Sequence, residues 1–230
     1  MLKLESTVIA NGAFRLGADM EIAPRSKIAV IGPSGAGKST LIEAIAGFLP
    51  IESGRMLWQG RDITQDHPGK RPVAMLFQDA NLFPHLSVMQ NVGLGLRPDL
   101  RLSASERTKV ETALDRVGIG ALASRKPAEL SGGQRSRAAL ARVLLQQRDI
   151  LLLDEPFAAL GPALRAEMLD LVAALSEETG ATLLMVSHAP EDARRIADQA
   201  ILVADDQAAP PVDTLQLLDN PPPALRVYLG

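Results

Sequence analysis

The sequence predicts an α/β protein in which a mostly parallel sheet carries an antiparallel β edge subdomain and an inserted helical subdomain. Short apolar runs typical of buried strands alternate with helical segments along most of the chain, which favours a parallel sheet. Residues 2–31 instead alternate apolar and polar side chains, as antiparallel strands do when one face meets solvent. Between residues 79 and 135, helix-capping signals replace the strand pattern.

The first third of the chain should supply most of the antiparallel strands. Asn11 and Gly12 form a strong signal for a two-residue hairpin turn. Residues 54–60 predict another short strand, bounded by two glycines. The continuous apolar run at residues 73–77 ends at Gln78 and predicts a buried parallel strand.

The rest of the chain should alternate helices with strands. Capping boxes at Ser87 and Ser103 begin two expected helices, and a long helix is expected after Ser131. The later expected elements are a core strand over residues 150–153 ending at Asp154, a helix from Pro162 to Gly180, a strand over residues 181–187, a short helix from Pro190 and a strand over residues 200–204.

All of residues 1–230 are expected to form one domain. Its core would comprise residues 1–78 and 136–206, with residues 79–135 as the inserted helical subdomain. Residues 207–230 are rich in proline and form a tail for which the pattern predicts no structure.

Composition excludes several classes of function. With 24 Lys and Arg against 27 Asp and Glu, the net charge of −3 gives no general attraction to nucleic acid or anionic lipid. The absence of cysteine excludes disulfides and thiolate zinc sites, and it permits a reducing setting. No leading segment reads as a signal peptide, and no apolar run approaches the roughly 20 residues that span a bilayer. We therefore expect any membrane role to depend on a partner.

A glycine-rich loop directly after the apolar run at residues 28–31 predicts a phosphate site. Its glycines let several backbone N–H groups converge on one anion at the start of a helix. Lys38 would reach the β- and γ-phosphates, and Ser39 would bind Mg²⁺. The residues expected to hold the nucleotide are Gly32, Pro33, Ser34, Gly35, Ala36, Gly37, Lys38, Ser39 and Thr40. A chance strand-to-helix turn is the alternative, but the strand before the loop and the helix after it argue against that reading.

Polar residues at the ends of other strands are candidates for the same phosphate site. Asp154 would hold Mg²⁺, and Glu155 would orient and deprotonate the attacking water. Gln78 could contact both metal and water, and His188 could bond the γ-phosphate. A solvated acidic loop and a packing or surface histidine are the alternatives. The carboxyl ends of the strands, where such ligands bind, favour the functional reading.

Residues 130–134 give a second helix-terminus anion site, in which Ser131, Gly132, Gly133 and Gln134 open a long helix. One chain needs only one cradle for a γ-phosphate. The simplest use of two is a head-to-tail homodimer in which each subunit closes over ATP on the other's loop. A serine cap before a flexible glycine pair is the alternative.

Together these motifs resemble those of the ATP-binding subunits of ABC transporters. Walker A at residues 32–39, the Q-loop at Gln78, the signature at residues 130–134, Walker B at residues 150–154 and the switch His188 occur in the family's order. The resemblance covers residues 1 to about 205 and implies a P-loop NTPase (RecA-like) fold, the cofactors ATP and Mg²⁺, and catalytic roles for Glu155, His188, Gln78 and Lys38.

Within that family, the chain is most similar to the subunits that power bacterial thiamine import. The closer match lies at residues 1–4, 72–78, 81–83, 93–96 and 151–164. This resemblance implies a peripheral position at the cytoplasmic face of the inner membrane and a homodimer on ATP binding. It also implies a multi-spanning permease docked between Phe77 and Val92, a periplasmic solute-binding protein as an indirect partner, and no nucleic acid.

Two positions depart from the family pattern. Asn11 stands where an aromatic usually stacks on adenine, which leaves Phe14 as the nearest substitute. Gly161 replaces the aspartate that usually ends the loop after Walker B, which removes a carboxylate from the dimer interface.

Three other functions compete with thiamine import. They are import of another solute, a non-transport ABC ATPase that regulates an envelope complex, and a small-molecule kinase with a phosphate loop. The kinase gives no account of residues 130–134.

Overall fold

The structure of the protein, a computed structural model, describes the backbone of residues 1–229 and the side chains of residues 1–226. Its eleven strands form one sheet in the order β5-β4-β1-β2-β10-β9-β3-β8-β7-β6, with β11 pairing to β9. The strands are β1 (Leu2–Asn11), β2 (Phe14–Ile22), β3 (Lys27–Ile31), β4 (Ile51–Trp58), β5 (Arg61–Asp62), β6 (Val73–Leu76), β7 (Ile150–Asp154), β8 (Thr182–Val186), β9 (Gln199–Ala204), β10 (Gln207–Ala208) and β11 (Val212–Asp213).

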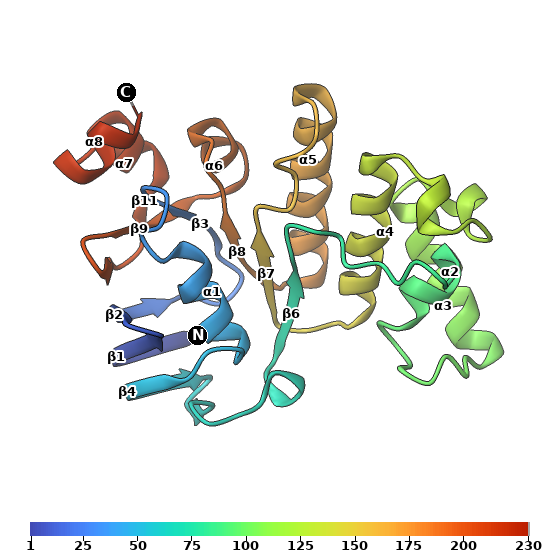
Figure 1. Cartoon of the computed structure of the whole chain (residues 1–230), viewed down its shortest axis with the longest axis horizontal. Coiled ribbons are helices and arrows are strands. Elements are labelled where there is room, and N and C mark those ends of the chain that lie inside the picture. Colours follow the sequence, from blue (N-terminus) through green and yellow to red (C-terminus); the bar gives the residue numbers. More distant parts are fainter. Residues whose placement is uncertain (230) are drawn as a thin grey trace.

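Helices cover the sheet and extend beyond its β6 edge (Figure 1). The α-helices are α1 (Lys38–Ala46), α2 (Val88–Gly93), α3 (Ala104–Arg116), α4 (Gly132–Leu145), α5 (Pro162–Thr179), α6 (Pro190–Ile196), α7 (Thr214–Asp219) and α8 (Pro223–Leu229). Three short 3₁₀ helices lie at Pro68–Lys70, Gly120–Leu122 and Pro127–Glu129. Among the residues that the structure describes, none of these helices has the length and apolar character to cross a membrane.

The parallel half of the sheet consists of β9, β3, β8, β7 and β6. Every residue of β8 is buried, because helices cover both faces of this half. Ile28 and Val30 of β3 pack in the core that contains α1, whereas Ala29 and Ile31 pack in the core that contains α4 and α5. The prediction of an α/β fold with parallel core strands is confirmed, and the sheet as a whole is mixed, because the antiparallel strands belong to it.

The antiparallel half is built around β1, which pairs with both β2 and β4. Asn11 pairs with Phe14 across the hairpin, so Gly12 and Ala13 form its turn, one residue beyond the position that the sequence indicated. Gly12 has a φ of 60°, a conformation that glycine adopts without strain. The strand expected over residues 54–60 is β4, and it begins earlier, at Ile51.

The two halves are one sheet because β10 joins them. This two-residue strand pairs parallel with β2 and antiparallel with β9. It lies in the tail that the sequence left without a prediction, as do β11, α7 and α8. The tail therefore completes the sheet.

The expected helix signals are found where the sequence placed them. Ser87, Ser103 and Ser131 are the N-caps of α2, α3 and α4, and each forms a complete capping box. Pro162 lies in the first turn of α5, and Gly180 ends it with a φ of 67°. Helices α2 and α3 pack against α4 on the right of Figure 1. The division into a core and an inserted subdomain at residues 79–135 stays a prediction.

Candidate functional site

The glycine-rich loop lies between β3 and α1, as expected, and its shape depends on glycine. A Cβ on Gly32 would lie 2.0 Å from the carbonyl oxygen of Val203, so any other residue would collide with the neighbouring strand. Gly35 and Gly37 have φ angles of 78° and 102°, which side chains rarely adopt. A Cβ on Gly37 would also lie 2.8 Å from the ring of Phe14. The loop is therefore a tight turn that ends at the N-terminus of α1, the geometry of an anion site.

The ammonium group of Lys38 is folded back over this loop. Its Nζ donates to the carbonyl oxygens of Gly32 and Pro33 at 2.9 and 2.8 Å. Burial lowers the pKa of Lys38, while the negative charges of Glu155 and Asp154 act in the opposite direction. A buried cation that bonds only neutral carbonyls would interact more strongly with a phosphate.

Ser39 and Asp154 meet at the carboxyl edge of the sheet. The Ser39 hydroxyl donates to Asp154 Oδ1 at 3.1 Å, and burial raises the pKa of Asp154. A hydroxyl and a carboxylate are the hard oxygen ligands that Mg²⁺ takes. In the part of the chain that the structure describes, no three His, Asp or Glu side chains gather to hold a metal. The donor set fits Mg²⁺ that is also held by nucleotide phosphates and water, as is usual for this ion.

Glu155 and His188 face each other across the ends of β7 and β8. His188 Nε2 lies 2.5 Å from Glu155 Oε1. Glu155 has a φ of 46°, an uncommon conformation for a residue with a side chain, and its N–H donates to Val186 O at 3.3 Å. Strain of this kind is concentrated at functional sites. Here it turns the carboxylate out of the strand direction and towards the histidine.

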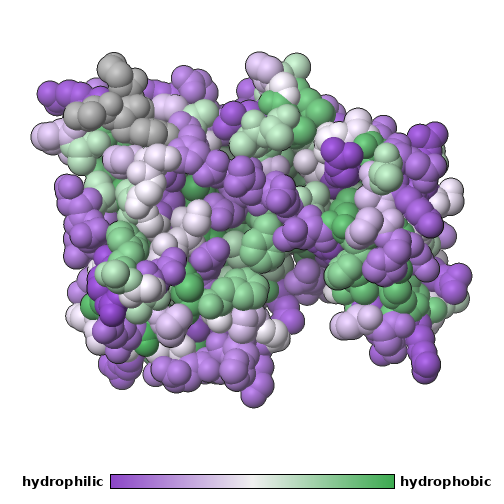
Figure 2. Space-filling view, viewed as in Figure 1, coloured by the Kyte–Doolittle hydropathy of each residue, from purple (hydrophilic) through white to green (hydrophobic). Residues whose placement is uncertain are grey.

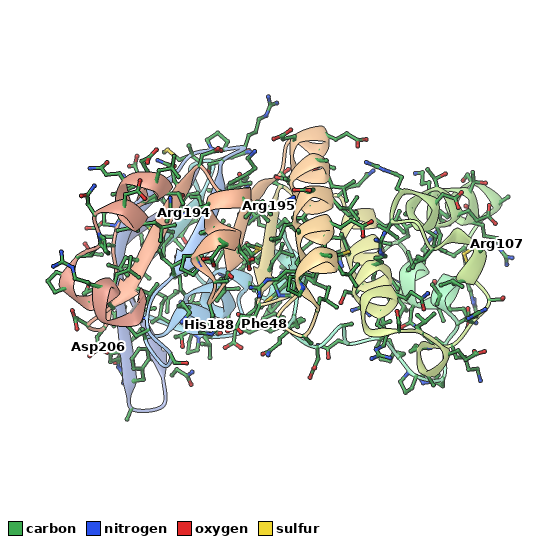
Figure 3. All side chains as sticks on the ribbon, turned by 90° about the horizontal axis from the view of Figure 1, so that it is seen from above. Phe48, Arg107, His188, Arg194, Arg195 and Asp206 are labelled. Atoms are coloured by element: carbon green, nitrogen blue, oxygen red, sulfur yellow. The ribbon has the colours of Figure 1, made fainter. Side chains whose placement is uncertain are left out.

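A pocket of about 440 Å³ brings these groups together. Its lining combines the phosphate loop and the start of α1 with Glu155, His188, Asn11 and Phe14. Phe14 is therefore the aromatic side chain of this pocket, while Asn11 at its mouth is exposed. Figure 3 shows His188 on the segment between β8 and α6.

Two groups of expected site residues lie elsewhere. Gln78 is exposed just after β6 and does not line this pocket. Residues 131–134 lie at the N-terminus of α4, outside the pocket as well. In a single chain, the structure thus assembles the phosphate loop with Asp154, Glu155 and His188 but leaves the signature residues apart.

The signature residues form a well-ordered helix start. Gln134 N donates to Ser131 Oγ at 3.3 Å, and Ser131 N donates to Gln134 Oε1 at 2.9 Å. Ser131 and Gly132 are exposed, whereas Gly133 is buried with Leu164 of α5. A Cβ on Gly133 would lie 2.3 Å from Leu164 Cδ2, so this glycine allows α4 and α5 to approach closely. The start of α4 is therefore an ordered helix terminus with Ser131 and Gly132 open to solvent.

The segment between Phe77 and Val92 presents an exposed aromatic surface that the sequence only partly indicated. Phe83 is 49% exposed and Phe48, at the end of α1, is 52% exposed. The rings of Phe48 and Phe77 lie 5.8 Å apart. Apolar side chains gather beside a notch between the body of the molecule and its helical part in Figure 2. Sequence reasoning missed Phe48, because it lies far from this segment along the chain.

Asn91 holds that segment in shape. It is fully buried, and its Nδ2 donates to the carbonyl oxygens of Phe83, Leu86 and Ser87 while its Oδ1 accepts from Phe83 N at 2.7 Å. The two N–H groups of the amide are shared among three carbonyl oxygens, and its oxygen accepts one further bond. A single asparagine in a helix gave no sequence signal for this role.

The chain is similar to known ATP-binding proteins of ABC transporters. Residues 16–158 match the ABC transporter family. The chain is 66% identical to the thiamine import ATP-binding protein ThiQ of Ruegeria sp. and 60% identical to that of Cereibacter sphaeroides, in both cases over the whole of each chain. It is 55% identical to ThiQ of Salmonella typhimurium over 84% of this chain and 83% of that protein.

Solved structures resemble the chain over nearly all of its length. An ATP-binding cassette in a dimeric post-hydrolysis state, bound to ADP and Pi, matches with a TM-score of 0.80 and 27% identity over 93% of this chain and 99% of that one. The protein cbiO1 from Clostridium perfringens, part of the ABC transporter complex cbiONQ, matches with a TM-score of 0.83 and 28% identity over 99% of this chain and 94% of that one. A nucleotide-free ATP-binding cassette shares the fold, with a TM-score of 0.89 and 24% identity over 100% of this chain and 99% of that one.

Proposed function

Because the chain belongs to the ABC transporter family as an ATP-binding subunit, we propose that it hydrolyses ATP to drive thiamine import through a membrane permease. The observation that carries the choice of solute is the 66% identity, over the full length of both chains, to a thiamine import ATP-binding protein. No residue of the nucleotide pocket would touch the solute.

The phosphate loop binds the β- and γ-phosphates of ATP in this proposal. Lys38 exchanges its two carbonyl partners for phosphate oxygens, which the 440 Å³ pocket has room to admit. Ser39, Asp154 and Gln78 hold Mg²⁺, which neutralises phosphate charge when it is bound. Gln78 reaches this position only if the segment after β6 moves towards the pocket, since the side chain lies outside it in the structure.

Glu155 is the proposed general base. Its carboxylate orients a water molecule towards the γ-phosphate and takes the proton that the water loses on attack. His188, which contacts Glu155, donates a hydrogen bond to the γ-phosphate. The contact between the two side chains supports this assignment, because it places a base and a phosphate ligand on the same side of the pocket.

Hydrolysis requires a second copy of the chain in this proposal. Ser131, Gly132, Gly133 and Gln134 of each subunit close over ATP held by the phosphate loop of the other. The exposure of Ser131 and Gly132, and the fact that residues 131–134 do not line the chain's own pocket, support the arrangement. Two such contacts, related by two-fold symmetry, would close the dimer on itself.

The permease docks on the aromatic surface between Phe77 and Val92 in this proposal, at the cytoplasmic face of the inner membrane. The exposure of Phe83, and the four hydrogen bonds by which Asn91 fixes the surrounding loop, support a preformed docking site. A periplasmic solute-binding protein would act on this chain only through the permease.

Reconstitution decides the solute. The chain is assembled in proteoliposomes with a thiamine permease and its periplasmic binding protein, and ATP hydrolysis is measured with and without thiamine. We expect thiamine-loaded binding protein to stimulate hydrolysis. A binding protein and permease for an unrelated solute serve as the control. Failure to assemble with the thiamine permease, or stimulation by the unrelated system, would reject thiamine and leave the ATPase assignment standing.

A further inference from the structure

A cluster of three polar side chains, two of them buried and one half-buried, lies beside His188. Arg165 comes from the first turn of α5, Ser187 follows β8 and Asp192 comes from α6. Ser187 is 3% exposed and Asp192 is 7% exposed. The three side chains line a cavity of about 370 Å³ that Glu155 and His188 also line. The cluster thus shares a wall with the two residues proposed to act on the γ-phosphate.

Hydrogen bonds tie the cluster into one unit. Arg165 donates from Nε to Asp192 Oδ2 at 2.9 Å, and its Nη2 contacts the same oxygen. Arg165 Nη2 also donates to Ser187 Oγ at 3.3 Å. The Ser187 hydroxyl donates to Asp192 Oδ2 at 2.6 Å and accepts from Ala189 N at 3.1 Å. One hydroxyl is therefore held from three directions.

These bonds fix the backbone on both sides of His188. Ser187 precedes the histidine and Ala189 follows it, and both take part in the network. The side chain of His188 is 38% exposed, and its Nε2 contacts Glu155 Oε1. The position of the imidazole against Glu155 depends in part on how firmly the short segment from Ser187 to Ala189 is held.

Stability alone does not account for the cluster. Burying an ion pair costs desolvation energy that its attraction often fails to recover. Helices α5 and α6 are also joined by a second ion pair at the surface, in which Arg195 Nε and Nη2 donate to the two carboxylate oxygens of Asp170, both at 2.7 Å. Figure 3 shows Arg195 on α6, on the side nearest α5. A second link between the same helices, whose carboxylate is buried, points to a task other than joining them.

The helix that supplies Arg165 also contacts the signature residues. Leu164, the preceding residue, packs against Gly133, and Leu160 lies nearest to Gly132. The first turn of α5 therefore touches the signature helix with one side chain and the segment that carries His188 with the next. A shift of α5 relative to the sheet would displace both.

We propose that Arg165, acting through Asp192 and Ser187, is a positioning residue that holds His188 in place for ATP hydrolysis. The proposal rests on the function proposed above and adds a residue to it that does not touch the nucleotide. Arg165 sets the main-chain position of Ser187 and Ala189, and these set the contact between His188 and Glu155. A misplacement of about 1 Å in such a site can cost roughly 10²-fold in rate.

The test compares Arg165→Met with Arg195→Met, which breaks the surface link between the same two helices. The turnover number and KM for ATP are measured on the full chain at saturating Mg²⁺, together with the melting temperature. For Arg165→Met we expect turnover to fall by roughly 10- to 10²-fold with KM changed by less than about 2-fold. For Arg195→Met we expect both kinetic values to stay within about 2-fold of wild type.

Asp192→Asn keeps the shape of the cluster, so it can test the proposal even if Arg165→Met fails to fold. The amide oxygen can still accept from Ser187 but no longer attracts Arg165, so we expect a smaller loss of turnover, roughly 3- to 10-fold, again at unchanged KM. A purely structural role would lower the melting temperature of both variants and leave turnover per folded molecule intact. Turnover within about 2-fold of wild type in both folded variants would overturn the proposal.

Assays of the wild-type chain distinguish failure of the positioning role from failure of the proposed ATPase function. A wild-type chain that does not hydrolyse ATP would overturn both. Active wild-type enzyme, together with loss of turnover in Glu155→Gln and normal turnover in Arg165→Met and Asp192→Asn, would overturn only the positioning role.

Discussion

The phosphate-loop region and the signature region are both helix N-termini rich in glycine, yet they differ in how complete they are. Around the loop, Lys38, Ser39, Glu155 and His188 line one pocket within a single chain, and Ser39 bonds Asp154. Around the signature, the exposed side of the helix start carries only its own capping box. The first region forms a pocket within one chain, whereas the residues of the second lie outside that pocket.

This difference shows what a parallel sheet assembles by itself. Strands β3, β8 and β7 are neighbours, so residues that follow them meet at one edge of the sheet. Helix α4 begins beside the segment that follows β7, where Leu160 and Leu164 lie against Gly132 and Gly133, yet residues 131–134 do not line the pocket. If the start of α4 contacts nucleotide, as proposed, it would do so on another molecule.

The largest effect is expected for Glu155→Gln, which removes the base from the complete region. The change keeps the size of the side chain, so ATP binding should persist while turnover falls by about 10²–10⁴-fold. Steady-state hydrolysis and ATP-dependent dimerisation measure the two properties. Glu191→Gln, an exposed change close to His188 along the chain, is the control and should leave turnover unchanged. Full activity in Glu155→Gln would show that Glu155 is not the general base.

The next largest effect is expected for a change in the signature region. Ser131→Arg should leave ATP affinity of the single chain unchanged and reduce turnover by roughly 10²-fold, because donors aimed at the phosphate of the partner are lost. It should also lower the free energy of unfolding by about 0.5–2 kcal/mol through loss of the N-cap.

Ser103→Arg is the matched control for this prediction. Ser103 caps α3 with the same kind of capping box, away from the signature residues. Both variants should lose similar stability, but only Ser131→Arg should lose turnover. Equal turnover in the two variants would mean that the start of α4 has no more than a structural role.

Much of this comparison could be predicted from the sequence. The glycine-rich loop, the acidic pair, the capping boxes at Ser87 and Ser103 and the serine cap at Ser131 are local patterns, and their elements form where the patterns indicated. Strand β10 could not be predicted, since two residues carry no periodicity. It forms because it pairs with the edges of β2 and β9, which lie on either side of it.

Contacts between distant segments also escaped prediction. Arg165 and Asp192 are 27 residues apart, and Phe48 reaches Phe77 only after α1 and β6 have packed. The alternation of strands and helices indicates which residues follow strands but says nothing of which helix turn lies behind them. Exposure of Gln78 outside the pocket is a detail of the same kind.

A smaller effect tests how the phosphate-loop pocket recognises the adenine base of ATP. Phe14 lines the pocket beside Gly37, whereas Asn11 offers no ring for stacking. If Phe14 stacks on adenine, Phe14→Ala should weaken ATP binding by about 1–3 kcal/mol, and any preference for ATP over GTP should disappear. Nucleotide binding measured by calorimetry decides this, with Phe83→Ala as an aromatic control outside the pocket. Unchanged affinity and unchanged preference would exclude Phe14 from base recognition.

The smallest effect is expected at Gly161, the N-cap of α5. No side chain caps this helix, and a Cβ at Gly161 would meet no heavy atom within 4 Å. Gly161→Asp should therefore raise the free energy of unfolding by a few tenths of a kcal/mol, roughly the difference between the two residues at this position. It should also change cooperativity between the two ATP sites more than ATP affinity. An unchanged Hill coefficient would show that the missing carboxylate has no part in the communication between the sites.

Mixing two inactive variants tests the central claim, that the phosphate loop of one chain works with the signature of another, most directly. Glu155→Gln chains and Ser131→Arg chains are prepared separately, combined in equal amounts and assayed for ATP turnover. In a head-to-tail dimer, a mixed pair contains one site with an intact Glu155 and an intact partner signature, so up to about a quarter of wild-type turnover should return. If each chain instead used its own signature, every site in the mixture would carry a defect. Turnover no higher than that of the separate variants would contradict the account.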